Sequence, residues 1–430
     1  MRVAFFTLGC KVNQYETQVM TERLSQAGFE IVSHNDNADI YIVNSCTVTA
    51  TSDQKTRQCV RRFKKNHPQS VVVLTGCMPQ AYPQNADILP EADIVLGNRN
   101  TDILISAIDE YFLSGKRIFN VKNIVDKEEF ESMQISGFNE RTRAFVKIED
   151  GCNRFCSYCI IPTARGRVRS KPLDELRTEL EALEKSGFLE IVLVGINLSA
   201  YGLGTDKNIC DAVELACSFE GFKRVRLGSL EPDHITREVI ERLSKCDKLC
   251  PQFHISLQSG CDETLKRMNR HYTTEEYRQL CRDLRANFEN CAITTDVMVG
   301  FAGETEEEFN SSLEFVKEIA FSDAHVFAYS RRAGTRAADF PNQVLKSDKE
   351  KRSKLMIKAT PESCAKYLAS RVGKIADVLF EIIDKDGYCV GHTSDYVLVK
   401  VKAPEITCGS IYKVMITGAE STYCIGKLAD

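Results

Sequence analysis

RAFVKIEDGCNRFCSYC, residues 143–159, is the stretch that decides the fold of this chain. It begins with the strand-like RAFVKIE and runs directly into a loop that carries Cys152, Cys156 and Cys159. The same strand and helix unit recurs to about residue 340, with helical patterns such as DELRTELEALEKSG between the strands. The six predicted strands lie at 143–149, 190–196, 223–229, 252–258, 292–300 and 323–330. Six such units predict an open, incomplete version of the eightfold βα barrel, in which chemistry takes place at the C-terminal ends of the strands.

The cysteines of this loop follow the spacing C-x3-C-x2-C, which is unusual for a structural zinc site. Structural zinc takes four ligands, usually from two separated pairs of cysteine or histidine, and no spare pair lies nearby. A [4Fe–4S] cluster that is held by three cysteines leaves one iron open to another ligand. The spacing therefore favours an iron–sulfur cluster over zinc.

A second set of cysteines follows the strands of the N-terminal segment. Short apolar strands at 3–8, 39–45, 70–76 and 92–97 alternate with helical patterns, which predicts a doubly wound parallel sheet. Cys10, Cys46 and Cys77 each come just after one of these strands, and ligands gather at that edge of such a sheet. Three independent core thiols are the alternative, but the shared position favours a second three-thiolate metal site.

The last 60 or so residues have a different pattern of short strands and turns. This pattern predicts a small β-barrel. We expect three domains, at residues 1–130, 138–368 and 371–430. The fold class is therefore α/β, with a parallel N-terminal sheet, a central open (βα)6 barrel and a terminal β-barrel.

Composition limits the possible functions. The 430 residues carry a formal net charge of -4, so any nucleic-acid surface must be a local patch. No run approaches the about 18 apolar residues that a membrane helix needs, and the N-terminus lacks a signal-peptide pattern. We expect a cytoplasmic protein without membrane contact, whose 18 cysteines stay reduced.

The cysteine loop, with Tyr158 before its last cysteine and a βα barrel around it, resembles the radical S-adenosylmethionine (SAM) enzymes. The whole chain resembles their methylthiotransferase family, through LGCKVNQYET, VNSC, TGCMPQ, GCNRFCSYCIIPTARGRVRS, DVMVGFAGETEEEF and HVFAYSRRAGT. The resemblance implies two [4Fe–4S] clusters, one on Cys10, Cys46 and Cys77 and one on Cys152, Cys156 and Cys159. SAM on the open iron of the second cluster yields a 5′-deoxyadenosyl radical, the first cluster holds the sulfur, and each turnover uses two SAM molecules.

The resemblance also suggests neighbours for SAM at the strand ends. These residues are Tyr158, Gly195, Asn197, Ser229, Glu231, Ser256 and Gln258. Each of them is also a type of residue that commonly forms turns or hydrogen bonds at strand ends.

The substrate that the resemblance implies is tRNA at the anticodon stem-loop. LGCKVNQYET is more similar to the branch that modifies N6-threonylcarbamoyladenosine, next to the anticodon, than to the QMN-type motif of the isopentenyladenosine branch. The terminal barrel resembles the TRAM module, an RNA-binding barrel, although its acidic residues slightly outnumber its basic ones. The resemblance also implies an electron donor as a partner, which the sequence does not identify. Within the tRNA, the phosphates are expected to contact the protein.

Two basic stretches are candidates for contact with those phosphates. They comprise Lys55, Arg57, Arg61, Arg62, Lys64 and Lys65 in the first stretch, and Arg165, Arg167 and Arg169, with Arg154 and Lys171, in the second. A solvated helix face is the alternative for the first stretch.

Two other functions stay open at this point. One is the isopentenyladenosine methylthiotransferase. The other, of a different class, is a non-catalytic RNA-binding protein with zinc at its cysteines. The sequence does not reveal the oligomeric state.

Overall fold

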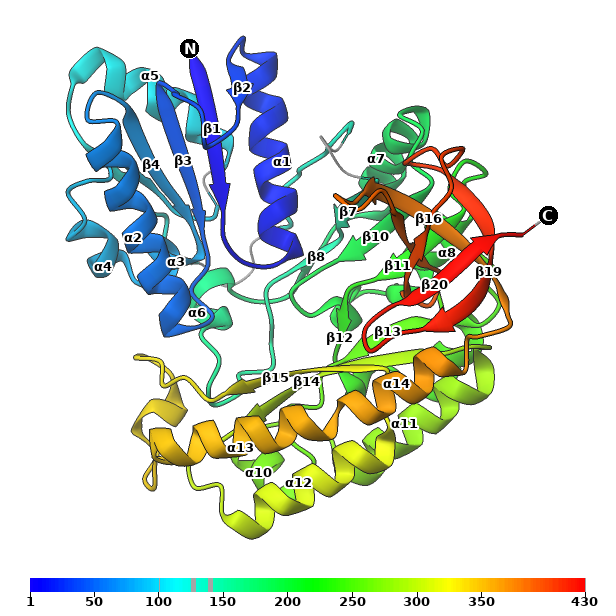
Figure 1. Ribbon diagram of the computed structural model, residues 1–430. Helices are drawn as coiled ribbons and strands as arrows, with labels where there is room; N and C mark the ends of the chain where they lie inside the picture. Colours follow the sequence, from blue (N-terminus) through cyan, green and yellow to red (C-terminus); the bar gives the residue numbers. More distant parts are fainter. Residues whose placement is uncertain (100, 125–128, 138–141, 430) are drawn as a thin grey trace.

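The computed structural model describes residues 1–99, 101–124, 129–137 and 142–429 (Figure 1). Its N-terminal part is a six-stranded, wholly parallel sheet in the order β2-β1-β3-β4-β5-β6. The strands are β1 (Arg2–Thr7), β2 (Glu30–Val32), β3 (Ile40–Ser45), β4 (Val71–Gly76), β5 (Ile94–Leu96) and β6 (Ile118–Asn120). The helices are α1 (Lys11–Gln26), α2 (Ala50–Asn66), α3 (Cys77–Ala81), α4 (Pro83–Asp87) and α5 (Leu104–Ser114).

Helices cover both faces of this sheet because its central strands are apolar on both sides. Every residue of β3 and β4 is buried. Tyr41 and Val43 pack toward Phe63 of α2, whereas Ile40 and Ile42 belong to a separate apolar cluster with residues of α1 and α5. Since successive side chains of a strand point to opposite faces, two layers of helices can bury one sheet. The predicted doubly wound sheet is confirmed.

The central part is an open barrel of parallel strands. They form two sheets, β11-β10-β7 and β12-β13-β14-β15, and only Gly228 separates β11 from β12. Within the described residues, neither β7 nor β15 has a second neighbour, so the barrel stays open between them. The strands are β7 (Arg143–Lys147), β10 (Glu190–Val194), β11 (Arg224–Leu227), β12 (Ser229–Leu230), β13 (Gln252–Ile255), β14 (Ala292–Val299) and β15 (Asp323–Ala328).

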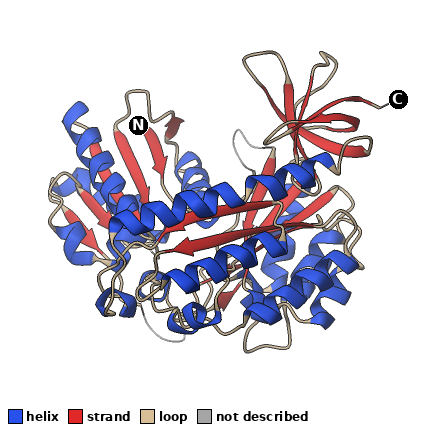
Figure 2. Ribbon diagram, turned by 60° about the horizontal axis from the view of Figure 1, so that its bottom comes forward, coloured by secondary structure: helices blue, strands red, loops and turns tan. Residues whose placement is uncertain are grey.

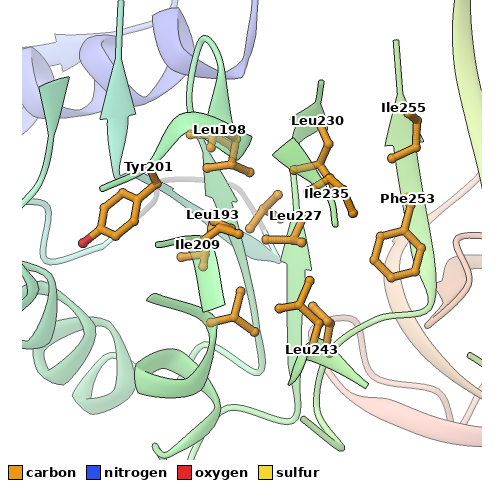
Figure 3. Close-up of a cluster of buried hydrophobic side chains, with 14 of the residues drawn as sticks. Leu193, Leu198, Tyr201, Ile209, Leu227, Leu230, Ile235, Leu243, Phe253 and Ile255 are labelled. Carbon is orange, nitrogen blue, oxygen red and sulfur yellow. The ribbon is translucent and has the colours of Figure 1, made fainter. Parts of the chain in front are cut away.

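Amphipathic helices pack on the outside of this barrel. They are α7 (Leu173–Lys185), α8 (Ile209–Cys217), α9 (Arg237–Leu243), α10 (Asp262–Arg267), α11 (Thr274–Asn287) and α12 (Glu306–Ile319). Figure 3 shows part of the resulting core, where Leu193 and Leu227 of adjacent strands lie beside Ile209. Capping boxes start α11 at Thr273 and α12 at Thr305, and these fix where each helix begins.

The segment that follows β7 contains three short elements. They are β8 (Glu149–Asp150), α6 (Ile161–Arg165) and β9 (Arg169–Ser170), and β8 pairs antiparallel with β9. This small hairpin closes the base of the cysteine loop.

Two helices, α13 (Lys346–Ala359) and α14 (Pro361–Ala369), lead from the open barrel to a closed five-stranded barrel (Figure 2). Its strands run in the order β16-β17-β18-β20-β19, and β19 pairs with β16. They are β16 (Ile375–Ile383), β17 (Cys389–Thr393), β18 (Leu398–Val401), β19 (Ile411–Ala419) and β20 (Cys424–Leu428). The three parts of the predicted fold class are thus confirmed. In the described part of the chain, no helix combines the length and the apolar character that crossing a membrane requires.

Candidate active site

The N-terminal cysteines meet at the switch point of their sheet. Cys46 and Cys77 directly follow the adjacent strands β3 and β4, and Cys10 lies just beyond β1. Strand order reverses at β1, whose neighbours are β2 and β3, and ligands of doubly wound sheets bind where the order reverses. The three thiols lie within electrostatic reach of one another, because Cys46 raises the pKa of Cys10, Cys77 that of Cys46, and Cys10 that of Cys77.

The second group of cysteines lies on the loop between β8 and α6. Gly151 starts this loop with a φ of +86°, and a Cβ atom there would lie 2.0 Å from the carbonyl oxygen of Arg167. Only glycine fits such a left-handed, crowded position. The Cys152 backbone N–H donates to the Gly166 carbonyl at 3.0 Å, so the loop folds back on itself and draws its cysteines together.

Each sulfur of this second group receives a hydrogen-bond donor. The backbone N–H of Arg154 lies 3.4 Å from Cys152 Sγ, and the N–H of Ile161 lies 3.5 Å from Cys159 Sγ. Arg270 Nη1 lies 3.4 Å from Cys156 Sγ. Donors aimed at sulfur stabilise a thiolate that ligates metal.

Without metal, these thiols stay protonated. Burial raises the pKa of Cys152 to about 12 and also raises the pKa of Cys156 and Cys159. Metal must therefore displace protons when it binds.

Each group of cysteines offers three thiolates in one region. In the first group, the thiols interact electrostatically around a strand switch point, and in the second group they share one short loop. A four-iron cluster takes each thiolate on a different iron, so three cysteines can hold it. Within the described ranges, no group of His, Cys, Asp or Glu side chains suited to a single metal ion is found.

The two groups of cysteines belong to one contiguous region. Helix α3, which begins at Cys77, packs against α6, which follows Cys159. Ala81 and Tyr82 share an apolar cluster with Ile160 and Ala164. The N-terminal sheet and the open barrel thus present their cysteine loops to each other, as Figure 1 shows for α3 and α6.

Asn98 also connects the two groups. Its Nδ2 donates to the Ala164 carbonyl at 2.9 Å and lies 3.9 Å from Cys77 Sγ. Its Oδ1 is buried with no hydrogen-bond partner among the described residues. A buried acceptor without a partner is available to accept a hydrogen bond from a ligand.

A buried cluster of charges lies at this joint. Arg165 of α6 donates to Glu16 of α1 at 2.7 and 3.0 Å and to Asp150 at 3.2 Å. Lys147 bonds the same two carboxylates, to Glu16 at 2.9 Å and to Asp150 at 2.7 Å. Burial alone would raise the pKa of Glu16 and Asp150, but these cations outweigh it and hold both carboxyl groups below their usual range.

Arg165 also acts on the N-terminal cysteines. Burial raises the pKa of Cys10, Cys46 and Cys77, and the Arg165 guanidinium opposes that rise at each of them. A residue of the open barrel therefore favours thiolates in the N-terminal sheet.

Most of the residues that we predicted around SAM lie at the strand ends beside the second cysteine group. A Cβ on Gly195 would lie 2.6 Å from Glu149 Oε2, so the bare backbone makes room there. Asn197 Nδ2 lies 3.7 Å from Cys152 Sγ. Asn197 Oδ1 and Gln258 Oε1 are buried and have no hydrogen-bond partner in the part of the chain that is described, which leaves them free for a ligand.

Glu231, Ser256 and Tyr158 have other partners. Glu231 forms an ion pair with Arg270, and the Ser256 carbonyl accepts from Arg270 and from the Tyr272 hydroxyl. Tyr158 packs edge-on against Phe301 in an apolar cluster. Ser229 is exposed and borders a cavity inside the barrel.

The structure corrects part of the second basic stretch. Arg165 is 1% exposed and Lys171 is also buried, in an ion pair with Glu179. Tertiary burial places both charges inside the protein, so RNA does not reach them. Arg169 is largely occupied by Asp150 at 3.3 Å, whereas Arg167 is exposed and its guanidinium lies 4.5 Å from the centre of the Phe155 ring.

The first basic stretch lies on α2, as predicted, and is mostly exposed. Lys64 pairs with Asp93 at 2.8 Å, and Arg61 pairs with Glu91 at 3.3 Å. Arg62 lies over Phe6 and Phe63. The remaining members are Lys55 and Lys65, which are exposed, and Arg57, which is half-buried.

Sequence reasoning missed three residues of the region. They are Arg270, Asn98 and Glu149, and none of them stands in a motif or a periodic position that marks it. Glu149 directly precedes the loop, accepts from the Asn197 N–H at 2.7 Å, and has a pKa that burial raises to about 8. Its place at the end of the predicted strand 143–149 is visible in the sequence, but its burial is not.

Comparison with known proteins places two family models on the chain. Residues 2–97 match the uncharacterized protein family UPF0004, and residues 146–316 match the radical SAM superfamily. Among solved structures, the radical SAM methyltransferase TsrM from Kitasatospora setae, with cobalamin and a [4Fe-4S] cluster bound, has a TM-score of 0.58 at 14% identity over 78% of this chain and 77% of its own. That likeness concerns the fold alone.

Relatives extend along nearly the whole chain. The threonylcarbamoyladenosine tRNA methylthiotransferase MtaB of Bacillus subtilis is 39% identical over 99% of this chain and 96% of its own length. The protein of the same name from Aquifex aeolicus is 35% identical over 87% and 91%. A tRNA-2-methylthio-N(6)-dimethylallyladenosine synthase of Clostridium botulinum is 34% identical over 98% and 95%.

Proposed function

This chain belongs to the radical SAM methylthiotransferase family, and we propose that it converts N6-threonylcarbamoyladenosine in tRNA to its 2-methylthio derivative. The observation that carries the proposal is similarity to enzymes of that activity along the full chain, together with two groups of three cysteines at one joint. The adenosine concerned lies in the anticodon stem-loop.

We assign one [4Fe–4S] cluster to each group of cysteines. Cys10, Cys46 and Cys77 hold the auxiliary cluster, and Cys152, Cys156 and Cys159 hold the cluster that binds SAM. When bound, these groups supply a radical that opens a C–H bond and the sulfur that replaces the hydrogen. The chain itself orients the thiolates through Arg270, and it surrounds them with buried side chains that exclude water.

Polar atoms at the strand ends hold SAM in this proposal. Asn197 Oδ1 and Gln258 Oε1 are buried acceptors without partners among the described residues, and Gly195 leaves room for the ligand. The exposed cations of α2, which follows the Cys46 loop, bind tRNA phosphates beside the site.

The direct test is the nucleoside profile of tRNA from a strain that lacks this gene. Mass spectrometry should show that the 2-methylthio form of threonylcarbamoyladenosine disappears and that its unmodified precursor accumulates. Loss of the isopentenyl methylthio nucleoside alone would mean that the chain belongs to the other branch.

Metal content separates this function from a zinc-dependent RNA-binding protein. Anaerobically purified protein should carry about eight iron per chain, the sum of two four-iron clusters. Stoichiometric zinc with little iron would contradict the proposal.

Cysteine variants test the division of labour. Alanine at Cys152, Cys156 and Cys159 together should abolish SAM cleavage, whereas alanine at the N-terminal three should leave cleavage but no methylthio product. Cys261→Ala, outside both groups, is the matched control and should change neither. The same phenotype from both triple variants would refute the assignment.

A further inference from the structure

A cavity of about 670 Å³ lies where three parts of the chain meet. Thr7 and Lys11 border it from the N-terminal sheet, Arg226 from the open barrel, and Tyr396 from the terminal barrel. A second cavity, of about 370 Å³, lies inside the open barrel and shares Lys11, Arg226 and Tyr396 with the first. The volumes are of the size that a small-molecule group or a nucleoside requires.

The terminal barrel is anchored at this cavity by its turn between β17 and β18. Arg226 Nη1 donates to the Ser394 carbonyl at 2.9 Å, and its Nε donates to Glu190 at 2.9 Å. Tyr396 has a φ of +67°, and its ring lies 4.7 Å from the Arg226 guanidinium carbon. A left-handed tyrosine is a strained position, which occurs preferentially where function requires it.

The arginines around the cavity already have partners. Arg226 is 1% exposed and bound as described. Arg143 pairs with Glu381 at 2.7 Å and lies 3.8 Å from Glu190. These partners hold the walls together, but Arg143, Arg224 and Arg226 share the single carboxylate of Glu190, so Arg226 and Arg143 still lower the pKa of nearby Lys11.

Two of the acidic groups that border the cavities, Glu381 and Asp296, have basic side chains beside them, whereas Asp323 at the second cavity accepts only from the backbone N–H of Ala324 among the described residues. Glu381 accepts from His392 as well as from Arg143. Asp296 lies 3.3 Å from both His254 and His325.

Lys11 differs from all of these. Its side chain is exposed and borders both cavities. Among residues 1–99, 101–124, 129–137 and 142–429, no hydrogen bond or close ion pair of its ammonium group is found. It is therefore a cation that faces a cavity and is available to an anionic ligand.

Its position matches the substrate of the proposed function, on which this inference rests. Lys11 directly follows Cys10, one of the residues assigned to the auxiliary cluster. Threonylcarbamoyladenosine carries a free carboxylate on its threonyl group. The outer N–H of its urea can close a hydrogen bond to N1 of the adenine, which places the threonyl group on the edge of the base that contains C2, the atom to be methylthiolated.

We propose that Lys11 binds the threonyl carboxylate of the substrate nucleoside and thereby selects threonylcarbamoyladenosine over adenosines with uncharged N6 groups. The ammonium group would hold the acidic arm of the nucleoside in the cavity, beside the loop that carries Cys10. An isopentenyl group offers no anion to Lys11.

Equilibrium binding of labelled anticodon stem-loops to the full-length reconstituted protein tests this, with fluorescence anisotropy and without SAM. One RNA carries the free acid and the other carries its methyl ester, which removes only the charge. The unchanged protein should bind the acid about 10- to 100-fold more tightly, the range that one charge-assisted hydrogen bond supplies. Equal binding of acid and ester would refute the proposal without any variant.

Two substitutions assign the effect to Lys11. Lys11→Gln should bind acid and ester equally, and Lys11→Arg should recover the preference for the acid. If Lys11→Gln weakened both RNAs by the same factor, Lys11 would contact a phosphate, and if it kept the preference, another residue would read the carboxylate. Either outcome overturns the proposal.

Turnover separates this inference from the proposed function. If the unchanged protein forms no methylthio product from the free-acid stem-loop, the proposed function fails. If it forms product but does not distinguish acid from ester, only the role of Lys11 fails.

Discussion

Replacing Arg165 by methionine should lower the free energy of unfolding by about 3–5 kcal/mol. This is the loss expected when one partner of a buried ion pair is removed and the other stays buried. Arg165 is 1% exposed and donates to Glu16 and Asp150, which belong to different parts of the chain. In the variant, Glu16 would keep only Lys147 as a partner, which it shares with Asp150, while Asp150 would also keep Arg169.

Arg167→Met is the matched control, because it removes the same group two residues farther along. Arg167 is exposed and its guanidinium lies 4.5 Å from the Phe155 ring. Because Arg167 is exposed and Arg165 is buried among carboxylates, this variant should lose clearly less than Arg165→Met.

Urea unfolding of anaerobically purified protein, followed by circular dichroism, measures both losses through the transition midpoints. A second step separates charge from packing. In the Arg165→Met background, adding Glu16→Gln alone should restore part of the stability, because Lys147 then keeps Asp150 as its partner and no carboxylate is left in excess. Equal midpoints for Arg165→Met and Arg167→Met, or no recovery in this double variant, would refute the reasoning.

Two further predictions concern the second cysteine loop. Because burial raises the pKa of Glu149 to about 8, the folded metal-free chain binds one proton more than the unfolded chain between about pH 4.5 and 8, and its stability should fall as pH rises through that window. Glu149→Gln should remove this fall. The urea midpoint of the variant, relative to that of the unchanged chain, should therefore rise with pH up to about pH 8. Parallel pH profiles of the two proteins would contradict the prediction. Arg270→Met removes the donor 3.4 Å from Cys156 Sγ and should weaken metal retention at that loop about 10- to 100-fold, measured as iron release to a chelator. Unchanged release kinetics would show that this contact does not support the cluster.

The order of elements and the positions of the cysteines follow from local pattern. Apolar strands such as Val71–Gly76 are buried on both faces, and this is why they read as continuous apolar runs. A cysteine directly after such a strand must lie at one edge of a parallel sheet, whichever strands are its neighbours. For this reason, the sequence predicted that Cys10, Cys46 and Cys77 share an edge before any contact was known.

The direction of the charged side chains did not follow from the sequence. Arg165 and Lys171 stand in a basic stretch that resembles an RNA-binding surface, yet both are buried against carboxylates from other elements. A run of basic residues shows where positive charges stand in the sequence. It does not show which carboxylates the fold places next to them. Only the packing of α1 against the barrel places Glu16 beside Arg165.

The sequence by itself determined the parallel sheets, the strand-end cysteines and the open barrel, because periodicity and strand-end position are local properties. The tertiary structure decided how the two cysteine groups face each other across α3 and α6, which cations are neutralised, and that Lys11 is the one that faces the cavity without a close partner among the described residues. These features depend on pairs of residues far apart in the chain. Burial and charge balance select such pairs only once the three parts are packed together.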